Sequence, residues 1–254
     1  MMNVVLLWYQ KKNKDNITRM RNILILLFAC LSLSSCTNRF SIEGVSSVSL
    51  HDGKKFYLKV PKAEGFVVLD STEMVHGEFD LKCKVDSVVL GSLFMENDLI
   101  LPIAIESGKI NVNIDNSKIS LKGTPLNNKI NEFMLEKNAL EDRAYEVERL
   151  ESRLIMDGKP QAEVEAEMEK QRSALSDDVA KLAKTYIQEN YSNVLGPGIF
   201  LIFCEGLEFP YITPLMEEII SDAPESFKND FFIKDFVNTA RRNMQKIQEA
   251  SREY

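Results

Sequence analysis

The hydrophobic pattern of this chain changes its period at Pro125, and this change constrains the fold more than any other feature. Before Pro125, apolar and polar residues alternate in short runs, as in residues 56–60 and 99–105. After it, apolar residues recur every three or four positions. A period of two is typical of half-buried strands, and a period near 3.6 is typical of amphipathic helices. We therefore predict an α+β protein, with strands first and helices second.

The region before Pro125 consists of short apolar runs separated by turn signals. Alternation is clear in residues 40–42, 56–60, 79–85, 99–105 and 110–114, and the turn signals include Asp52-Gly53, Glu64-Gly65, His76-Gly77, Glu96-Asn97-Asp98, Glu106-Ser107-Gly108 and Asp115-Asn116. Strands of this length and spacing, each with one apolar face, are typical of sandwiches and barrels. We predict an antiparallel β-sandwich or barrel of about eight strands, in a domain at residues 36–125.

The region after Pro125 begins with two long amphipathic stretches. The helix breaker Asp157-Gly158-Lys159-Pro160 separates them. Two long helices joined by a tight turn form an antiparallel hairpin. We place this helical hairpin at residues 127–190, inside a helical region at residues 126–254.

A C-terminal helical segment follows the hairpin. Residues 190–198 are expected to connect to the apolar run Ile199 to Cys204, whose pattern leaves helix and strand open. Thr213 and Pro214 are suited to the N-cap and the first position of a short helix that ends near Ser221. A last amphipathic helix is expected after Pro224.

The N-terminal residues have the features of an export signal. Arg19 and Arg21 precede an apolar run, Ile23 to Leu33, which is too short to cross a bilayer. The run ends in Leu33-Ser34-Ser35-Cys36, which resembles the lipobox of bacterial lipoproteins. In such proteins the cysteine carries acyl chains such as palmitate and becomes the first residue of the mature chain. We therefore predict a lipoprotein signal peptide at residues 1–35 and lipidation of Cys36.

Two alternatives exist for this segment, and its start is also open. An uncleaved N-terminal anchor, or a soluble export signal cut nearby, would make Cys36 incidental. Residues 1–18 fit a signal peptide poorly, because they place an apolar patch before a basic cluster. Translation from Met20 would give a conventional short basic region.

The charge of the chain limits its partners. The 254 residues carry a net charge of −7, which argues against a nucleic-acid partner. Residues 1–35 carry a net charge of +4, so residues 36–254 carry −11. An acidic mature surface disfavours adsorption to anionic headgroups, so the lipid on Cys36 is expected to provide the membrane attachment.

The cysteines left after cleavage indicate no redox motif. Cys83 and Cys204 are far apart in sequence, and the chain has no C-x-x-C. They could pair in an oxidising periplasm, but buried free thiols are the favoured interpretation.

Several short motifs in the β region occur in a recognisable order. They are Phe40-Ser41-Ile42-Glu43-Gly44, Asp52-Gly53-Lys54, Leu69-Asp70-Ser71, Gly77-Glu78-Phe79, Glu106-Ser107-Gly108-Lys109-Ile110 and Gly123-Thr124-Pro125-Leu126-Asn127. Across residues 39–127 this set resembles the domain of unknown function that precedes the thioredoxin-like domain of many thiol–disulfide interchange lipoproteins. Residues 180–244 are similar to the helical linker of those proteins.

The resemblance implies a membrane-attached module that faces the periplasm. Residues Thr37 and Asn38 follow Cys36, so the aspartate associated with retention in the inner membrane is absent. In lipoproteins of this type that implies the outer membrane. The redox cysteines of the thioredoxin-like domain have no matching positions here, so no catalytic residue is carried over.

The polar residues form no motif for catalysis, cofactor binding or metal binding. Glu73 and His76 have the spacing of a helical metal pair, but they lie between predicted strands, which favours a polar turn. His51 lies at an Asp-Gly turn, so both histidines are expected to be exposed. Gly196-Pro197-Gly198 lacks the lysine and hydroxyl of a phosphate loop. We expect no enzyme activity, no cofactor and no metal.

The sequence thus supports two main functional hypotheses. The first is a non-enzymatic, lipid-anchored module that binds an unknown protein or small ligand through the sandwich or the hairpin. The second is an accessory of a thiol–disulfide interchange system that docks a separate thioredoxin-like protein. An enzyme with a site assembled from scattered polar residues is a third, less favoured hypothesis. The apolar stripes of the helices are expected to form core, and the hairpin at 127–190 is the preferred region for partner contact.

Overall fold

The structure is a computed structural model that describes residues 38–250. The predicted signal peptide at residues 1–35 and the predicted lipidation site at Cys36 lie outside the described residues. Residues from Arg39 onward form one compact unit. Its strands precede its helices, as the change of period at Pro125 predicts.

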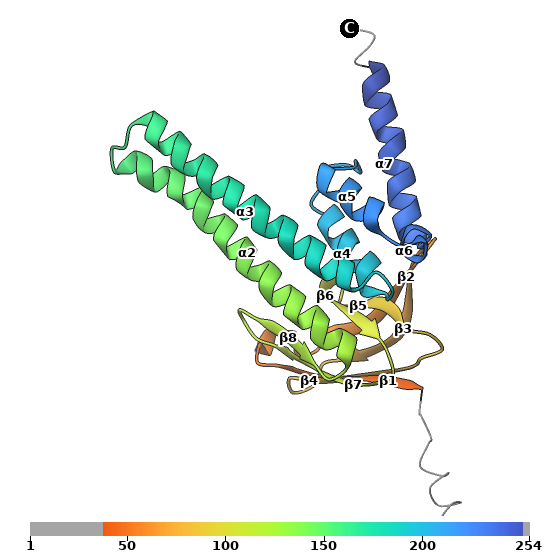
Figure 1. Cartoon of the computed structure of the whole chain (residues 1–254). Coiled ribbons are helices and arrows are strands. Elements are labelled where there is room, and N and C mark those ends of the chain that lie inside the picture. The colour runs from red at the N-terminus through yellow and green to blue at the C-terminus, as the bar shows by residue number, and fades with distance from the viewer. Residues whose placement is uncertain (1–37, 251–254) are drawn as a thin grey trace, which may run out of the picture. The chain divides into compact units, whose positions relative to one another are not determined.

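Eight strands form two four-stranded sheets (Figure 1). The first sheet has the order β4-β1-β7-β8 and the second has the order β3-β2-β5-β6. Each sheet ends on both sides in a strand that pairs with no further strand of the sandwich. The structure is therefore a sandwich and not a closed barrel. The strands are β1 (Arg39–Ser46), β2 (Lys55–Lys62), β3 (Gly65–Glu73), β4 (Glu78–Lys84), β5 (Val89–Met95), β6 (Asp98–Ile105), β7 (Gly108–Ile114) and β8 (Ile119–Lys122).

The prediction of a wholly antiparallel sandwich needs one correction. β1 and β7 pair in parallel, from Phe40 beside Gly108 to Ser46 beside Ile114, whereas the other strand pairs are antiparallel. Alternation fixes which face of a strand is buried, but it carries no information about the direction of the neighbouring strand.

Aromatic side chains join the two sheets in the interior. Phe56 of β2 stacks on Phe79 of β4, with 4.2 Å between ring centroids. Both residues are at alternating buried positions of their strands. Gly44 of β1 makes room for this pair, because a β-carbon there would lie 1.9 Å from the Phe79 ring.

The helices follow in the order expected from the sequence, with one short helix added. They are α2 (Pro125–Met156), α3 (Gln161–Glu189), α4 (Leu195–Cys204), α5 (Pro214–Asp222), α6 (Glu225–Lys228) and α7 (Phe231–Ala250). Figure 1 shows α2 and α3 side by side as the predicted hairpin, and the chain turns between them at Asp157–Pro160. Among the described residues, none of these helices has the length and apolar character that a bilayer span needs.

The first turns of α2 cover one open side of the sandwich. Asn127 is fully buried and bonds to β6, the edge strand of the second sheet. Four residues later, Asn131 accepts a hydrogen bond from the Leu121 amide of β8, the edge strand of the first sheet, at 3.0 Å. One helix face therefore supplies hydrogen-bond partners to the edges of both sheets, which would otherwise keep buried backbone groups unpaired.

The side chain of Asp70 connects the sheets at the opposite side. The carboxylate of Asp70 in β3 accepts a hydrogen bond from the Lys82 amide of β4 at 2.7 Å. β3 and β4 are the remaining edge strands of the two sheets. Asp70 thus has a structural role, because its hydrogen bond holds the edges of the two sheets together.

The distal part of the hairpin has a small core of its own. Val147, Val164 and Met168 are buried there. Near the turn, Ile155 and Met156 are exposed, with 56% and 84% of their surface accessible. The apolar stripes of the hairpin are therefore used mainly for packing, as the sequence predicts.

The apolar run whose conformation the sequence leaves open is helical. α4 begins at Leu195, inside the segment that the sequence analysis assigns to a connector. Pro197 is tolerated there because backbone amides of a first helical turn have no partner within the helix. Gly198 lets α4 approach β5 closely, since a β-carbon at this position would lie 2.2 Å from Leu90.

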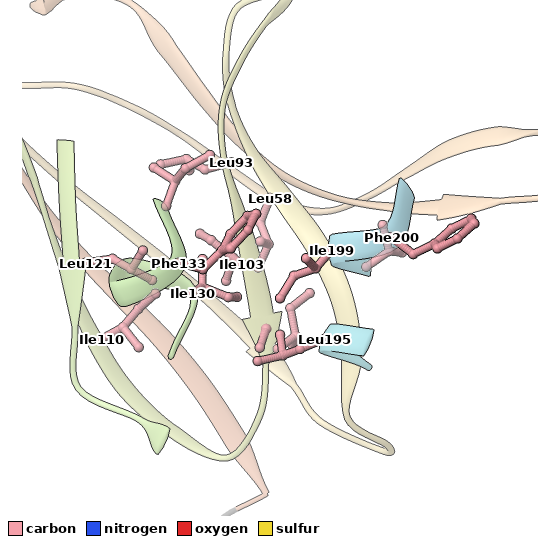
Figure 2. Packing of buried hydrophobic residues seen from close by; sticks show 14 of the residues in the cluster. Leu58, Leu93, Ile103, Ile110, Leu121, Ile130, Phe133, Leu195, Ile199 and Phe200 are labelled. Carbon is pink, nitrogen blue, oxygen red and sulfur yellow. The ribbon is translucent and has the colours of Figure 1, made fainter. Parts of the chain in front are cut away.

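Apart from the small core in the distal hairpin, the core residues of the described region are continuous through strands and helices. Figure 2 shows Ile130 and Phe133 of α2 next to Ile103 of β6, with Ile199 of α4 nearby. The helices that follow the sandwich are thus packed on it, and their packing also produces the hollow described next.

Candidate binding groove

A groove of about 760 Å³ lies in the part of the chain that the structure describes. Strands β2, β3, β5 and β6 of the second sheet line one side of it. Helices α2 and α4, together with the residues between α4 and α7, line the other. The groove therefore exists only because the helices pack on the sandwich.

Most of the groove wall is apolar. Leu90 and Pro102 contribute to it from β5 and β6, and Met134, Leu201 and Ile202 contribute from α2 and α4. These side chains are only half-buried, so the groove leaves part of their apolar surface open to a ligand. Apolar walls with a few polar groups are the usual composition of small-molecule sites.

Charged groups occur at the groove, and three of them already have partners. Lys137 pairs with Glu141 one turn further along α2. Asp230 accepts the amides of Phe232 and Ile233 and so caps α7. These three charged side chains have structural roles, and their existing contacts compete with any ion pair or hydrogen bond to a ligand.

Two further charged residues line the groove. Within residues 38–250, neither Lys62 at the end of β2 nor Glu205 after α4 forms an ion pair. Lys62 therefore offers a cation to the anionic head of a ligand, and Glu205 offers an acceptor.

The strand β3 forms an exposed edge beside the groove. Phe66, Val67 and Val68 follow one another on this strand, with 57%, 47% and 49% of their surfaces accessible. Phe66 also lines the groove and contacts Phe94 edge-on, with 5.2 Å between centroids. Consecutive exposed apolar residues on an edge strand are unusual, because such an edge can pair with another chain.

The two cysteines are free, as the favoured interpretation predicts. Both are half-buried. Burial, and to a lesser extent the carboxylate of Glu205, raises the pKa of the Cys204 thiol to about 12. Burial, followed by the charge of Asp70, also raises the pKa of Cys83. Thiols with a raised pKa are poor nucleophiles near neutral pH, so neither has the features of a redox or catalytic cysteine.

The histidines lie on turns, but they differ in exposure. His76 is exposed, as predicted, and has a left-handed backbone with φ of 55°. His51 is half-buried in a short 3₁₀ helix, Ser49–His51, with its Nδ1 atom 2.8 Å from Ser46 Oγ. The expectation that His51 is exposed is therefore wrong. In the region that the structure describes, no three His, Cys, Asp or Glu side chains are grouped as metal ligands.

The groove is a feature that the sequence analysis missed. Its residues come from β2, β3, β5, β6, α2, α4 and the segment between α4 and α7, and no local motif connects these parts of the chain. One local signal is the run Ile199 to Cys204 in α4, which has no polar residue. The hairpin, which the sequence favours for partner contact, contributes Met134, Lys137 and Glu141 from its first half.

Comparisons with known proteins give one family match. Neither the curated proteins nor the solved structures yield a match to this chain. The family match covers the strands and the first turns of α2, including Asn127, and it leaves most of the helical region outside. Residues 40–130 match the model of the family described as "Domain of unknown function (DUF4369)".

Proposed function

We propose that this protein is a lipid-anchored bacterial lipoprotein of the outer membrane that faces the periplasm. In this proposal its folded part is a non-enzymatic binding module, and the groove holds a small apolar ligand with a polar head. The lipobox-like segment before Cys36 supports the anchor. The groove supports the binding role.

The observation that carries the binding role is the size and composition of the groove. Its volume of about 760 Å³ lies within the range of about 300–1,000 Å³ that is usual for small-molecule sites. An apolar body can pack on Leu90 and Leu201, while an anionic head can reach Lys62. Removal of apolar ligand surface from water would supply most of the binding energy.

A second candidate function is the docking of a protein partner, a thioredoxin-like protein included. The exposed apolar edge at Phe66, Val67 and Val68 favours it, because an extended segment can add to such an edge as a further strand. Burial raises the pKa of both Cys83 and Cys204, which lowers the thiolate fraction that exchange with a partner would need.

A substitution at Gly206 tests ligand binding in the groove. Gly206 lines the groove, and a β-carbon there would have open space within 4 Å. Gly206→Phe therefore places a ring at the groove without a backbone clash. We expect the affinity for anilinonaphthalene sulfonate, an anionic apolar probe, to fall by roughly tenfold or more, which corresponds to about 1.4 kcal/mol. The measurement is a fluorescence titration, with dodecanoate as competitor.

The matched control is Ala174→Phe, which adds the same ring to an exposed position of α3. This variant should bind the probe as the unchanged protein does. Equal binding by all three proteins would contradict a site in the groove. Retention of the thermal midpoint in both variants excludes unfolding as the cause of any loss.

The anchor is tested by replacing the cysteine at its centre. A Cys36→Ser variant should be found in the soluble periplasmic fraction, because the acyl chains supply the stable membrane attachment. Cell fractionation with immunodetection measures this distribution. Retention of the variant in the membrane fraction, at the level of the unchanged protein, would refute lipidation of Cys36.

A further inference from the structure

On the outward face of the first sheet, basic and acidic residues lie at opposite ends of the strands β1 and β4. In the register of β1 with β4, Arg39 lies opposite Lys84, and Ser41 lies opposite Lys82. On the other side of β1, Ser41 lies beside Lys109 of β7. These positions alternate with buried ones, so their side chains share the exposed face. We call Arg39, Lys82, Lys84 and Lys109 the basic patch.

The acidic residues of this face lie at its other end. Glu43 is opposite Asp80, and Val45 is opposite Glu78. Lys109 pairs with Glu43, at the boundary between the two ends. Along β1 and β4 the face therefore runs from basic, where β1 begins, to acidic, where β1 ends. Lys122 of β8, opposite Asn111, is a further exposed cation at the edge of this face.

This arrangement opposes the ordinary preference of a sheet. Like charges directly across two strands repel each other, and opposite charges attract. Here Arg39 faces Lys84 and Glu43 faces Asp80, although exchanging one residue of each pair would give two attractive pairs. Folding does not account for the separation, so it indicates a function for the face.

The start of β1 lies close to the proposed anchor along the chain. Cys36 precedes Arg39 by three residues, and three residues can span at most about 11 Å. If Cys36 carries lipid, Arg39, the first residue of the basic patch, is tethered within that distance of the lipidated cysteine. This step rests on the proposed lipidation of Cys36.

We propose that the basic patch docks on the anionic headgroups of the membrane and so orients the anchored sandwich. The patch brings four cations to a surface that attracts Lys and Arg. The same headgroups repel the acidic end of the face. Attraction at one end and repulsion at the other both favour the orientation in which the basic patch faces the membrane. The overall charge of residues 36–254, −11, would by itself predict repulsion from an anionic membrane. At the basic patch the local charge is positive, so attraction is expected there.

Two neighbouring carboxylates belong to the electrostatic surroundings of the patch. Asp70 accepts the Lys82 amide, and Asp86 is exposed just after β4. Neither forms an ion pair with a patch residue among the described residues. The patch therefore keeps most of its charge available for headgroups.

Lysine acylation of the full chain in vesicles tests the proposal. The lipidated protein is reconstituted into vesicles of phosphatidylcholine, alone or with phosphatidylglycerol, and labelled with an N-hydroxysuccinimide ester. Mass spectrometry gives the rate at each lysine. We expect Lys82, Lys84 and Lys109 to react roughly threefold or more slowly in the anionic vesicles than in the neutral ones. Lys170, exposed on the hairpin, should react equally in both. About 1 M salt should remove the protection, since the Debye length is then about 3 Å.

A double variant tests whether charge causes the protection. Arg39→Gln with Lys84→Gln removes a repulsive pair, so folding should be retained, and Lys82 and Lys109 remain as reporters. Their protection should be lost. The matched control, Arg149→Gln with Arg172→Gln, removes two exposed cations from the hairpin and should leave protection of the patch intact.

The same preparation separates failure of the docking surface from failure of the anchor. Flotation with the vesicles, together with the mass of the acylated Cys36 peptide, reports the anchor. A protein that floats while its patch lysines react like Lys170 would overturn the docking surface and leave the anchor standing. A protein that neither floats nor carries acyl chains would overturn the anchor, and the orientation inferred from it as well.

Discussion

Replacing Asn127 by alanine is expected to lower the free energy of unfolding by about 2–4 kcal/mol. The buried amide of Asn127 donates to the Ala104 carbonyl at 2.6 Å and accepts from the Ala104 amide at 3.0 Å. It also donates to Thr124 Oγ1 at 2.8 Å. Truncation would leave both backbone groups of Ala104 buried without a partner, and urea unfolding measures the loss through its midpoint.

Its neighbour Asn128 provides the matched control. This side chain accepts the Gly123 amide at an exposed site, so Asn128→Ala should cost no more than about 1 kcal/mol. Asn127→Asp should be at least as damaging as Asn127→Ala, because a carboxylate would face the Ala104 carbonyl in place of the donor. Equal stability of Asn127→Ala and Asn128→Ala would contradict the role of Asn127 as a partner of the β6 edge.

Adding one methyl group at Gly44 is expected to cost about 2–4 kcal/mol. The new β-carbon would lie 1.9 Å from Phe79 Cε1, and Phe79 is held by its stacking on Phe56. Relief requires a shift of the ring inside a close-packed core. Thermal or urea unfolding of Gly44→Ala gives the measurement.

A second substitution distinguishes this clash from a general effect on β1. Phe79→Val removes the ring atoms that a β-carbon at position 44 would meet. The double variant should then be about as stable as Phe79→Val alone, with a coupling energy of about 1–3 kcal/mol. Additive losses would show that the ring of Phe79 is not the cause.

The sequence predicts this fold well where a local pattern records burial. Alternation identifies β4 and β7, because each has one face in the sandwich and one in water. Gly158 and Pro160 mark the turn of the hairpin, and Thr213 caps α5 by accepting the Met216 amide at 3.2 Å. Each of these signals acts between residues that are close in sequence.

Strands without one buried face are harder to predict. No residue of β3 is fully buried, and its run from Phe66 to Leu69 has no alternation. β5 has Leu93 in the sandwich and Leu90 against α4 on the other face, so its pattern is continuous. β8 has only four residues, Ile119–Lys122, which is too short for a period to be recognised.

The groove and the basic patch depend on long-range pairing. The groove forms where Gly198 of α4 meets Leu90 of β5. The patch forms because the register places Arg39 opposite Lys84 and Ser41 beside Lys109. Neither the contact of α4 with β5 nor the register of β1 with its neighbours follows from spacing along the chain. The sequence therefore contains these residues but does not predict that they lie next to one another.

The central claim is that an apolar ligand binds in the groove between the second sheet and α4. Photolabelling with an apolar diazirine, followed by peptide mapping, tests it most directly. We expect labels on β5, β6 and α4, near Leu90, Pro102 and Leu201, that dodecanoate suppresses and that Gly206→Phe strongly reduces. Labels confined to the hairpin tip at Ile155 and Met156, or to the β3 edge, would contradict it.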